Sequence, residues 1–454
     1  MDEYQTRELR YLNKLYERGE STILVVYCNR YVSAGTVIST FCQDKNYMFY
    51  RARSASERVQ LHLWATELRA RGVSISDYPD FKEFNQVMNG FRDKPMVMII
   101  DHFEKFVRSS DSFIRSLGSF VYDDQRPPVM VILTSQANEW VENSMVDVLG
   151  EQAQLIRGIL KLRESDFKVM REYFPKMSYT DAVQSFALMG GKSSLWHFFD
   201  GTKSFKENLC EQYLNRESYL YQIPLHIVRE NLRETAVYNT ILYELASGHT
   251  KLNDLHHATG YARAKIMVYI KNLIGLEIVE KVYSFSSSGR ENVQKGVYRI
   301  SDPMVHFYFR FIYPYQSNLQ LMSAEKYYDL FISAGLPVYV ESYFRQICRQ
   351  FLLRCDEQGR LPIRIEEEGE WVGKLGSIDI VAQSETGETI LGSCSWRNKM
   401  TKEDFEWLIN CSRKARLNGD YFYLFSGVGF TDELIELSET DSRILLLGPD
   451  ELQV

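Results

Sequence analysis

The sequence has 454 residues, of which 45% are hydrophobic and 25% charged, and its 53 basic and 60 acidic residues leave a net charge of −7. At ~100–200 residues per domain this length predicts two to four domains with separate cores. Ordinary numbers of glycine and proline exclude collagen-like, coiled-coil and disordered proteins. The negative charge excludes a global attraction to nucleic acid, which would need a local basic surface.

Neither a membrane nor a metal is expected as a partner of this chain. No apolar run approaches the ~18–20 residues that cross a bilayer, and the acidic start Met1-Asp2-Glu3 is unlike a signal peptide. The seven cysteines include no CxxC pair, which predicts buried free thiols rather than disulfides or a zinc site. We therefore expect a soluble, cytoplasmic protein.

The first third of the chain predicts a parallel sheet with helices on both faces. An amphipathic helix is expected over residues 2–20. Continuous apolar runs, separated by helical segments, follow at 22–27, 47–50, 96–100 and 129–133. Such runs are typical of strands buried on both faces of a parallel sheet. Ligands bind beyond the carboxyl ends of these strands, where Cys28, Asp101 and Thr134 stand.

The rest of the chain predicts a helical lid, a winged helix-turn-helix and a last α/β domain. Three helices and two strands indicate the winged helix-turn-helix, at 236–247, 251–258, 262–274, 277–285 and 296–300. One helix and three strands indicate the last domain, at 338–354, 377–381, 389–393 and 421–425. The sheet domain is expected over residues 1–163 and the helical lid over 164–232. The winged helix-turn-helix is expected over 233–310 and the last domain over 325–454.

The loop after the first strand has the placement of a phosphate-binding loop but not its residues. The candidate nucleotide-binding residues are Cys28, Asn29, Arg30, Ser33, Ala34, Gly35 and Thr36. The spacing G-x-x-x-x-G-K-[ST] puts Cys28 and Ser33 at the glycine positions and Ala34 at the lysine. Gly35 falls at the magnesium-binding hydroxyl, and Thr36 lies one position late. Because Ala34 offers no charge to the phosphates, two interpretations stay open: a vestigial nucleotide site and an ordinary strand-to-helix turn.

Several segments, taken in order, resemble a prokaryotic AAA/STAND-type ATPase family with a C-terminal domain similar to restriction endonucleases. Residues 25–32 resemble the family's loop VVYGRRRVGKT in degraded form, and residues 95–103 resemble its Walker B strand vvviDEf. Further matches over nearly the whole chain lie at 133–135, 156–158, 189–191, 205–208, 298–303 and 307–310. The resemblance implies a RecA-like doubly wound sheet, a helical lid, a winged helix and a restriction-endonuclease-like domain.

The resemblance also implies roles for residues at the ends of the strands. In the family, the Walker B aspartate, here Asp101, holds magnesium, and the next residue, here His102, is a glutamate that orients water. A neutral imidazole lacks that fixed negative charge, and with the lysine also absent we expect no ATP hydrolysis. ATP or ADP with magnesium would bind weakly. Arg157 matches the family's arginine segment. The alternatives are that Asp101 caps the next helix and that Arg157 forms a surface ion pair.

The last domain shows a comparable loss of catalytic residues. Its family counterpart resembles the PD-(D/E)xK nuclease fold, in which Asp and Glu bind magnesium and Lys aids the attack of water. Glu341 and Asp379 match two of the acids, but the Glu-x-Lys strand has serine at Ser393 and Ser395. Alternation along a strand puts Arg397 on the face of Ser393, within possible reach of the site. Because no carboxylate replaces Ser393, we expect no cleavage of DNA.

The winged helix is the least altered functional part. Residues 251–300 contain eight Lys or Arg and four acidic residues, an excess of four positive charges in a chain of net −7. The candidate DNA-binding residues, on the third helix and the wing, are Arg263, Lys265, Lys271, Arg290 and Lys295. The sequence predicts a non-hydrolysing regulator that binds double-stranded DNA or a protein partner. A slow ATPase with an atypical loop and a pure interaction scaffold stay open as alternatives.

Overall fold

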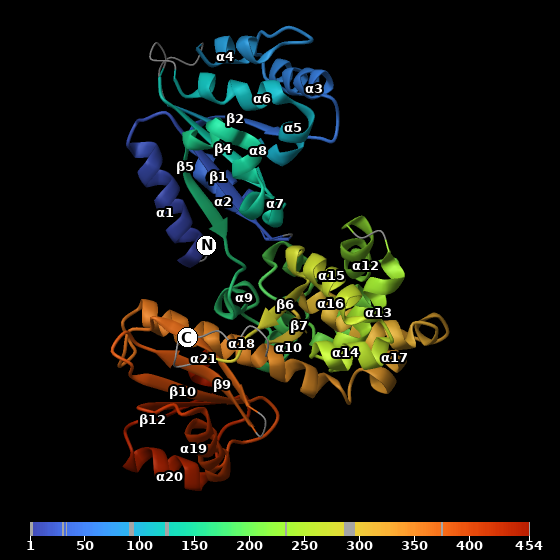
Figure 1. Ribbon diagram of the computed structural model, residues 1–454, viewed down its shortest axis with the longest axis vertical. Coiled ribbons are helices and arrows are strands. Elements are labelled where there is room, and N and C mark those ends of the chain that lie inside the picture. Colours follow the sequence, from blue (N-terminus) through green and yellow to red (C-terminus); the bar gives the residue numbers. More distant parts are fainter. Residues whose placement is uncertain are drawn as a thin grey trace. The chain divides into compact units, whose positions relative to one another are not determined.

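The computed structural model (Figure 1) describes residues 3–29, 31–32, 34–89, 95–122, 127–231, 234–285, 296–373 and 376–453. It divides into two compact units, of which one is Met1–Ser165 with Lys192–Ser194 and the other is Asp166–Gly191 with Leu195–Val454. The division after Ser165 lies close to the predicted boundary at 163. The predicted lid, winged helix-turn-helix and last domain together form a single unit. Across the described residues, no helix is long and apolar enough to cross a membrane.

A five-stranded parallel sheet forms the first unit. Its strands are β1 (Thr22–Cys28), β2 (Asn46–Arg51), β3 (Met96–Asp101), β4 (Val129–Ser135) and β5 (Ile156–Leu162). They lie in the order β2-β3-β4-β1-β5, and all neighbouring pairs are parallel. The prediction of a parallel, doubly wound sheet is confirmed. The edge strand β5 was not expected from the sequence. Its half-exposed residues alternate with exposed ones, so it forms no continuous apolar run.

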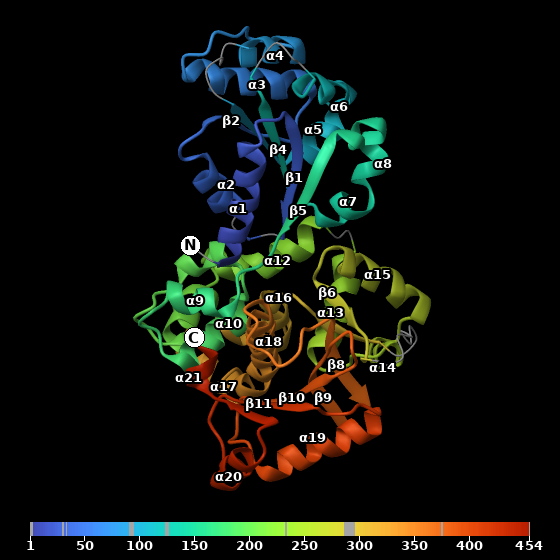
Figure 2. The same cartoon turned by 90° about the vertical axis from the view of Figure 1, so that its left-hand side faces the viewer.

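Helices cover both faces of this sheet (Figure 2). They are α1 (Glu3–Glu17), α2 (Ala34–Cys42), α3 (Glu57–Ala70), α4 (Phe81–Asn89), α5 (Phe103–Ser109), α6 (Asp111–Ser116), α7 (Asn138–Asn143) and α8 (Met145–Leu149). On one face, Phe41 of α2 belongs to the same buried cluster as Val26 of β1. On the other, Trp64 of α3 and Phe106 of α5 join Val25. Successive residues of a strand point to opposite faces, so an apolar run is needed to fill both cores.

The second unit opens with a run of helices that a β-hairpin follows. Its first seven numbered helices are α9 (Phe167–Tyr173), α10 (Tyr179–Met189), α11 (Phe205–Asn208), α12 (Tyr219–Asn231), α13 (Thr235–Ala246), α14 (Leu252–Thr259) and α15 (Arg263–Gly275). Strands β6 (Val279–Val282) and β7 (Val297–Ile300) then pair antiparallel. Gly260 ends α14 with a φ of 71°, which glycine adopts without steric cost, and the chain turns there toward α15.

A mixed sheet of five strands follows in the C-terminal part. It comprises β8 (Glu367–Gly373), β9 (Gly376–Gln383), β10 (Thr389–Ser395), β11 (Tyr421–Ser426) and β12 (Ile444–Leu447). Strands β8 to β10 are antiparallel and β10 to β12 parallel. The remaining helices are α16 (Pro303–Phe307), α17 (Ala324–Phe331), α18 (Leu336–Glu357), α19 (Lys402–Ala415), α20 (Asp432–Thr440) and α21 (Pro449–Leu452). Figure 1 shows α18 on one face of the sheet and α19 and α20 on the other.

The hairpin and the C-terminal sheet are joined directly. After β6, the backbone N–H of Phe285 donates to the carbonyl of Glu370 in β8 at 2.7 Å, and Ser284 bridges to the same strand. The Phe285 ring lies in the core cluster of the C-terminal sheet. Arg299 of β7 forms an ion pair of 2.6 Å with the Glu370 carboxylate. These contacts hold the hairpin against β8, the edge strand of the sheet.

Candidate functional site

The loop between β1 and α2 is held by amide hydrogen bonds. The side-chain amide of Asn138 donates to Asn29 Oδ1, and Asn29 Nδ2 donates to Glu164 Oε1 at 3.5 Å. The backbone N–H of Val32 donates to the carbonyl of Asn29 at 3.1 Å. The polar side chains that hold Asn29 are therefore an amide and a carboxylate. A carboxylate beside the loop repels phosphate.

The described residues of this loop offer a phosphate no replacement for the missing lysine. Ala34 begins α2 without a charge, and Thr36 follows in the same turn. Burial raises the pKa of the Cys28 thiol to about 12, so that thiol is neutral near pH 7. A Cβ at Gly35 would meet open space, so glycine is not needed there for a close backbone approach. Two candidate residues, Arg30 and Ser33, lie outside the described residues.

Asp101 stands at the carboxyl end of β3, where the resemblance implies a magnesium ligand, but both of its oxygens are engaged. Thr134 Oγ1 donates to Oδ1 at 2.5 Å, and Arg51 Nε donates to Oδ2 at 2.6 Å. Arg51 ends β2 and lies opposite Asp101 in the parallel register. The guanidinium thus supplies the positive charge that a metal ion would bring to this carboxylate.

His102 is the N-cap residue of α5, and its ring lies beside a carboxylate. Its backbone is left-handed, with φ 57° and ψ 42°, and its side chain does not cap the helix. Ring atom Nδ1 lies 3.3 Å from Oε1 of the buried Glu104. The alternative interpretation of Asp101 as the cap of this helix is wrong, because His102 is the N-cap residue and Asp101 binds Thr134 and Arg51 instead.

Arg157 lies at the other end of the sheet from the loop. It stands between Ile156, which pairs with Ile23, and Gly158, which pairs with Leu24, whereas Cys28 pairs with Leu162. At ~3.3 Å per residue, about 13–16 Å of strand separates Arg157 from Cys28. The structure therefore does not bring Arg157 to the nucleotide loop.

Lys161 is the basic residue of β5 that lies near the loop, and it was not predicted. It pairs with Tyr27 in register, and its Nζ lies 2.8 Å from Glu142 Oε1. The same oxygen accepts a hydrogen bond of 3.0 Å from the Tyr27 hydroxyl. The hydrogen bond from Lys161 lowers the pKa of Glu142, so this lysine already balances a carboxylate.

Millimolar ATP with magnesium is expected to leave the melting temperature of the protein unchanged. A ligand stabilises a protein only when its concentration is well above its dissociation constant, and the loop offers Ala34 where a lysine would bind phosphate. Thermal unfolding with and without ATP, ADP and magnesium measures this. A rise of several degrees would contradict the expectation, and magnesium-dependent release of phosphate would favour the slow ATPase.

Helix α18, strand β9 and the segment after β10 bring together the three predicted residues of the nuclease-like site. Pairing of β9 with β10 ends at Ile380 and Gly392. Beyond that point Asp379 Oδ2 accepts the backbone N–H of Cys394 at 2.9 Å. Farther along, Glu341 Oε1 accepts the backbone N–H of Trp396 at 3.3 Å. The two acids therefore satisfy backbone amides where the strands separate.

The remaining oxygens of both acids face arginines. Arg397 Nε donates to Glu341 Oε2 at 3.1 Å, so Arg397 does reach this site. Arg345 Nε lies 3.2 Å from Asp379 Oδ1. Burial raises the pKa of Asp379, against the opposing effects of Arg345 and the Cys394 amide. All seven cysteines, including Cys394 beside this site, are free and buried, as predicted.

The purified protein is expected not to cut DNA with either magnesium or manganese. Hydrolysis by a metal ion needs open carboxylate oxygens, and here Arg345 and Arg397 already pair with Asp379 and Glu341. Incubation of supercoiled plasmid with each metal, followed by electrophoresis, measures this. Cleavage that disappears in an Asp379→Ala variant would show that the site is active and would contradict the expectation.

Helix α15 carries the predicted basic residues on an exposed surface. Its buried side consists of Ile266, Ile270 and Leu273. Arg263, Lys265 and Lys271 are all exposed, whereas the wing residues Arg290 and Lys295 lie outside the described residues.

Two contacts fix the first turn of α15. Arg263 Nε donates to Asn253 Oδ1 of α14 at 2.7 Å. The Lys265 ammonium lies over the rings of Tyr261 and Tyr269 at 4.8 Å and 5.8 Å from their centroids. Arg263 and Lys265 are therefore held in place at the start of the helix.

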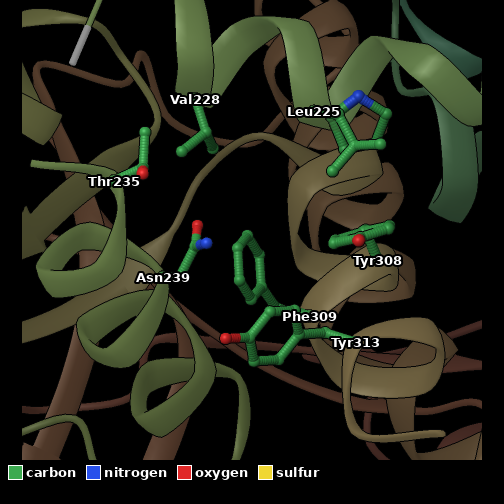
Figure 3. Close-up of a pocket in the computed structure, with 8 residues that line it drawn as sticks. Leu225, Val228, Thr235, Asn239, Tyr308, Phe309 and Tyr313 are labelled. Atoms are coloured by element: carbon green, nitrogen blue, oxygen red, sulfur yellow. The ribbon is translucent and has the colours of Figure 1, made fainter. Parts of the chain in front are cut away.

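A small cavity of about 100 Å³ lies between α12, α13 and residues 308–313 (Figure 3). Val228 and Leu225 line it from α12 and Asn239 from α13. The Phe309 ring lines it from residues 308–313. Ligand pockets are typically ~300–1,000 Å³. This cavity is too small for a nucleotide, and none of the predicted site residues lines it.

Comparison with known proteins finds a family model that matches about a fifth of the chain. Residues 308–406 match a family model, DUF234, described as archaeal and bacterial proteins of unknown function. This segment contains Glu341, Asp379 and Arg397. An uncharacterized protein of Methanocaldococcus jannaschii is 22% identical over 436 residues, which are 93% of this chain and 94% of that protein.

Two solved structures are similar to this chain at low identity. The Walker-type ATPase of Pyrococcus abyssi has a TM-score of 0.46 and 13% identity, and the match covers 67% of this chain and 95% of that one. The ORC2 protein of Aeropyrum pernix has a TM-score of 0.46 and 10% identity, with 69% of this chain and 92% of that one covered.

Proposed function

We propose that this chain is a DNA-binding regulator, related to P-loop ATPases, that neither hydrolyses nucleotide nor cuts DNA. The observation that carries the proposal is the surface of α15. That helix has three exposed basic residues, Arg263, Lys265 and Lys271, and no acidic residue anywhere in its sequence. It enters from the turn at Gly260, as the second helix of a helix-turn-helix does.

The proposed lack of catalysis is supported by arginine–carboxylate ion pairs at the candidate sites of both units. In the first, the Asp101 carboxylate is balanced by Arg51. In the second, Asp379 is balanced by Arg345, and Glu341 by Arg397. An arginine side chain at each carboxylate opposes metal binding, because the ion would have to displace a charge-assisted contact. Such pairs keep a fold intact without supplying chemistry.

Binding of duplex DNA is expected to depend strongly on salt. Neutralising phosphates releases counterions, so the logarithm of affinity falls by roughly 0.9 per contact for each unit in the logarithm of salt. With about four to six contacts the slope is roughly −4 to −5. Titration of a labelled duplex at several salt concentrations measures it. Binding that is insensitive to salt, or no complex at low salt, would contradict the proposal.

A protein partner is a second candidate, favoured by apolar residues on the same helix. Met267, Val268 and Ile274 are exposed on α15. Exposed apolar side chains are typical of protein contacts when they form a continuous patch. A partner-binding helix would leave DNA unbound at low salt, so the titration above separates the two candidates.

A further inference from the structure

The centre of the exposed side of α15 is a valine set between two lysines. Val268 is 60% exposed. Lys265 precedes it by three residues and Lys271 follows it by three, so both lie on the same side of the helix, one turn away in each direction. The neighbouring Met267 is held differently, because its sulfur accepts a hydrogen bond from Tyr298 at 3.3 Å.

An apolar side chain flanked by two cations is complementary to a DNA major groove. The apolar side chain would face the base edges on the groove floor, and the cations would face the phosphates along its walls. The groove is wide enough for a helix, its walls carry phosphates, and thymine alone among the four bases presents a methyl group there. Val268 has no hydrogen-bonding group, so it cannot read the donors or acceptors of a base edge. Its one favourable contact with a base is apolar, and that contact is with a methyl group.

We propose that Val268 gives α15 a preference for thymine by packing against the C5 methyl group in the major groove, while Lys265 and Lys271 contact the phosphates. This inference rests on the proposed binding of DNA by α15. The absence of any acidic residue in the sequence of α15 favours a polyanion such as DNA over a basic or mixed protein surface. The recognised chemistry is therefore a methyl-bearing pyrimidine in duplex DNA.

The test compares duplexes that differ only in the methyl group. Affinity is measured for an alternating A and T duplex and for the same duplex with uracil in place of thymine, and likewise for cytosine against 5-methylcytosine. Removing a methyl contact is expected to weaken binding about three- to fourfold. The Val268→Ala variant should bind the thymine duplex more weakly, and its ratio between the thymine and uracil duplexes should fall toward one.

The control is Val146→Ala, since Val146 of α8 is 57% exposed and so matches Val268 in type and exposure. This variant should keep the ratio of the parent. Equal binding of thymine and uracil duplexes by the parent, with salt-dependent binding intact, would overturn the inference and leave the proposed function standing. A Val268→Ala variant that keeps the full ratio would also overturn it, because DNA shape would then explain the preference. No binding of any duplex would overturn the proposed function itself.

Discussion

The double variant Arg263→Glu with Lys265→Glu is expected to bind duplex DNA roughly 100- to 1,000-fold more weakly than the parent at low salt. Each reversal replaces an attraction to phosphate by a repulsion, and each of these is worth ~1 kcal/mol across water. Since about 1.4 kcal/mol is tenfold in affinity, two reversals reach this range. The salt slope should also become less steep by about two, because two phosphate contacts are lost.

The control for this variant changes the net charge equally at another place. Lys82 in the first turn of α4 and Lys176 are both exposed, and Lys82→Glu with Lys176→Glu removes the same amount of positive charge. A global electrostatic effect would weaken DNA binding by both double variants to the same extent. If DNA binds through α15, only Arg263→Glu with Lys265→Glu should bind it more weakly than the parent. If Arg263→Glu with Lys265→Glu binds as tightly as the parent, α15 is not the binding surface and the interaction scaffold becomes the better interpretation.

The fold of the first unit was predictable where strands are buried on both faces. Strands β1, β3 and β4 are continuous apolar runs, and such a run fits only a strand with a core on each side. Strand β5 was missed because residues 157, 159 and 161 are exposed, so its pattern is that of a half-covered edge. Strand β8 is also an edge strand of its sheet, and its sequence is rich in glutamate.

The candidate sites were predictable in position but not in their partners. Period-two alternation put Arg397 on the face of Ser393, within possible reach of the site. In the structure β10 ends at Ser395, and Arg397 contacts Glu341 from the segment that follows. Arg345 was missed although it follows Glu341 by four residues on one helix, a spacing that puts both side chains on the same face. Arg51 was missed because its contact with Asp101 depends on the register of β2 against β3. No local pattern in the sequence determines that register.

Replacing Arg354 by methionine is expected to lower the free energy of unfolding by about 3–5 kcal/mol, because removing one partner of a buried ion pair leaves the other charge unpaired. Arg354 Nη1 of α18 lies 3.2 Å from Asp166 Oδ2, and the two side chains are only 5% and 7% exposed. Asp166 Oδ1 also accepts the backbone N–H of Val169 at 3.0 Å and so caps α9. The pair therefore holds the first helix of the second unit on α18, and urea unfolding measures the loss.

The matched control is Arg364→Met. Arg364 also lies 3.2 Å from a carboxylate, that of Asp356, but its side chain is 74% exposed. Exposed pairs contribute ~0.2–1 kcal/mol, because water screens them and side-chain entropy opposes them. Adding Asp166→Asn to Arg354→Met should recover part of the stability, since the amide oxygen can still cap α9 and no buried charge is left unpaired. A loss below about 1 kcal/mol for Arg354→Met would mean that water reaches Asp166 in the folded protein, and the cap alone would then hold α9.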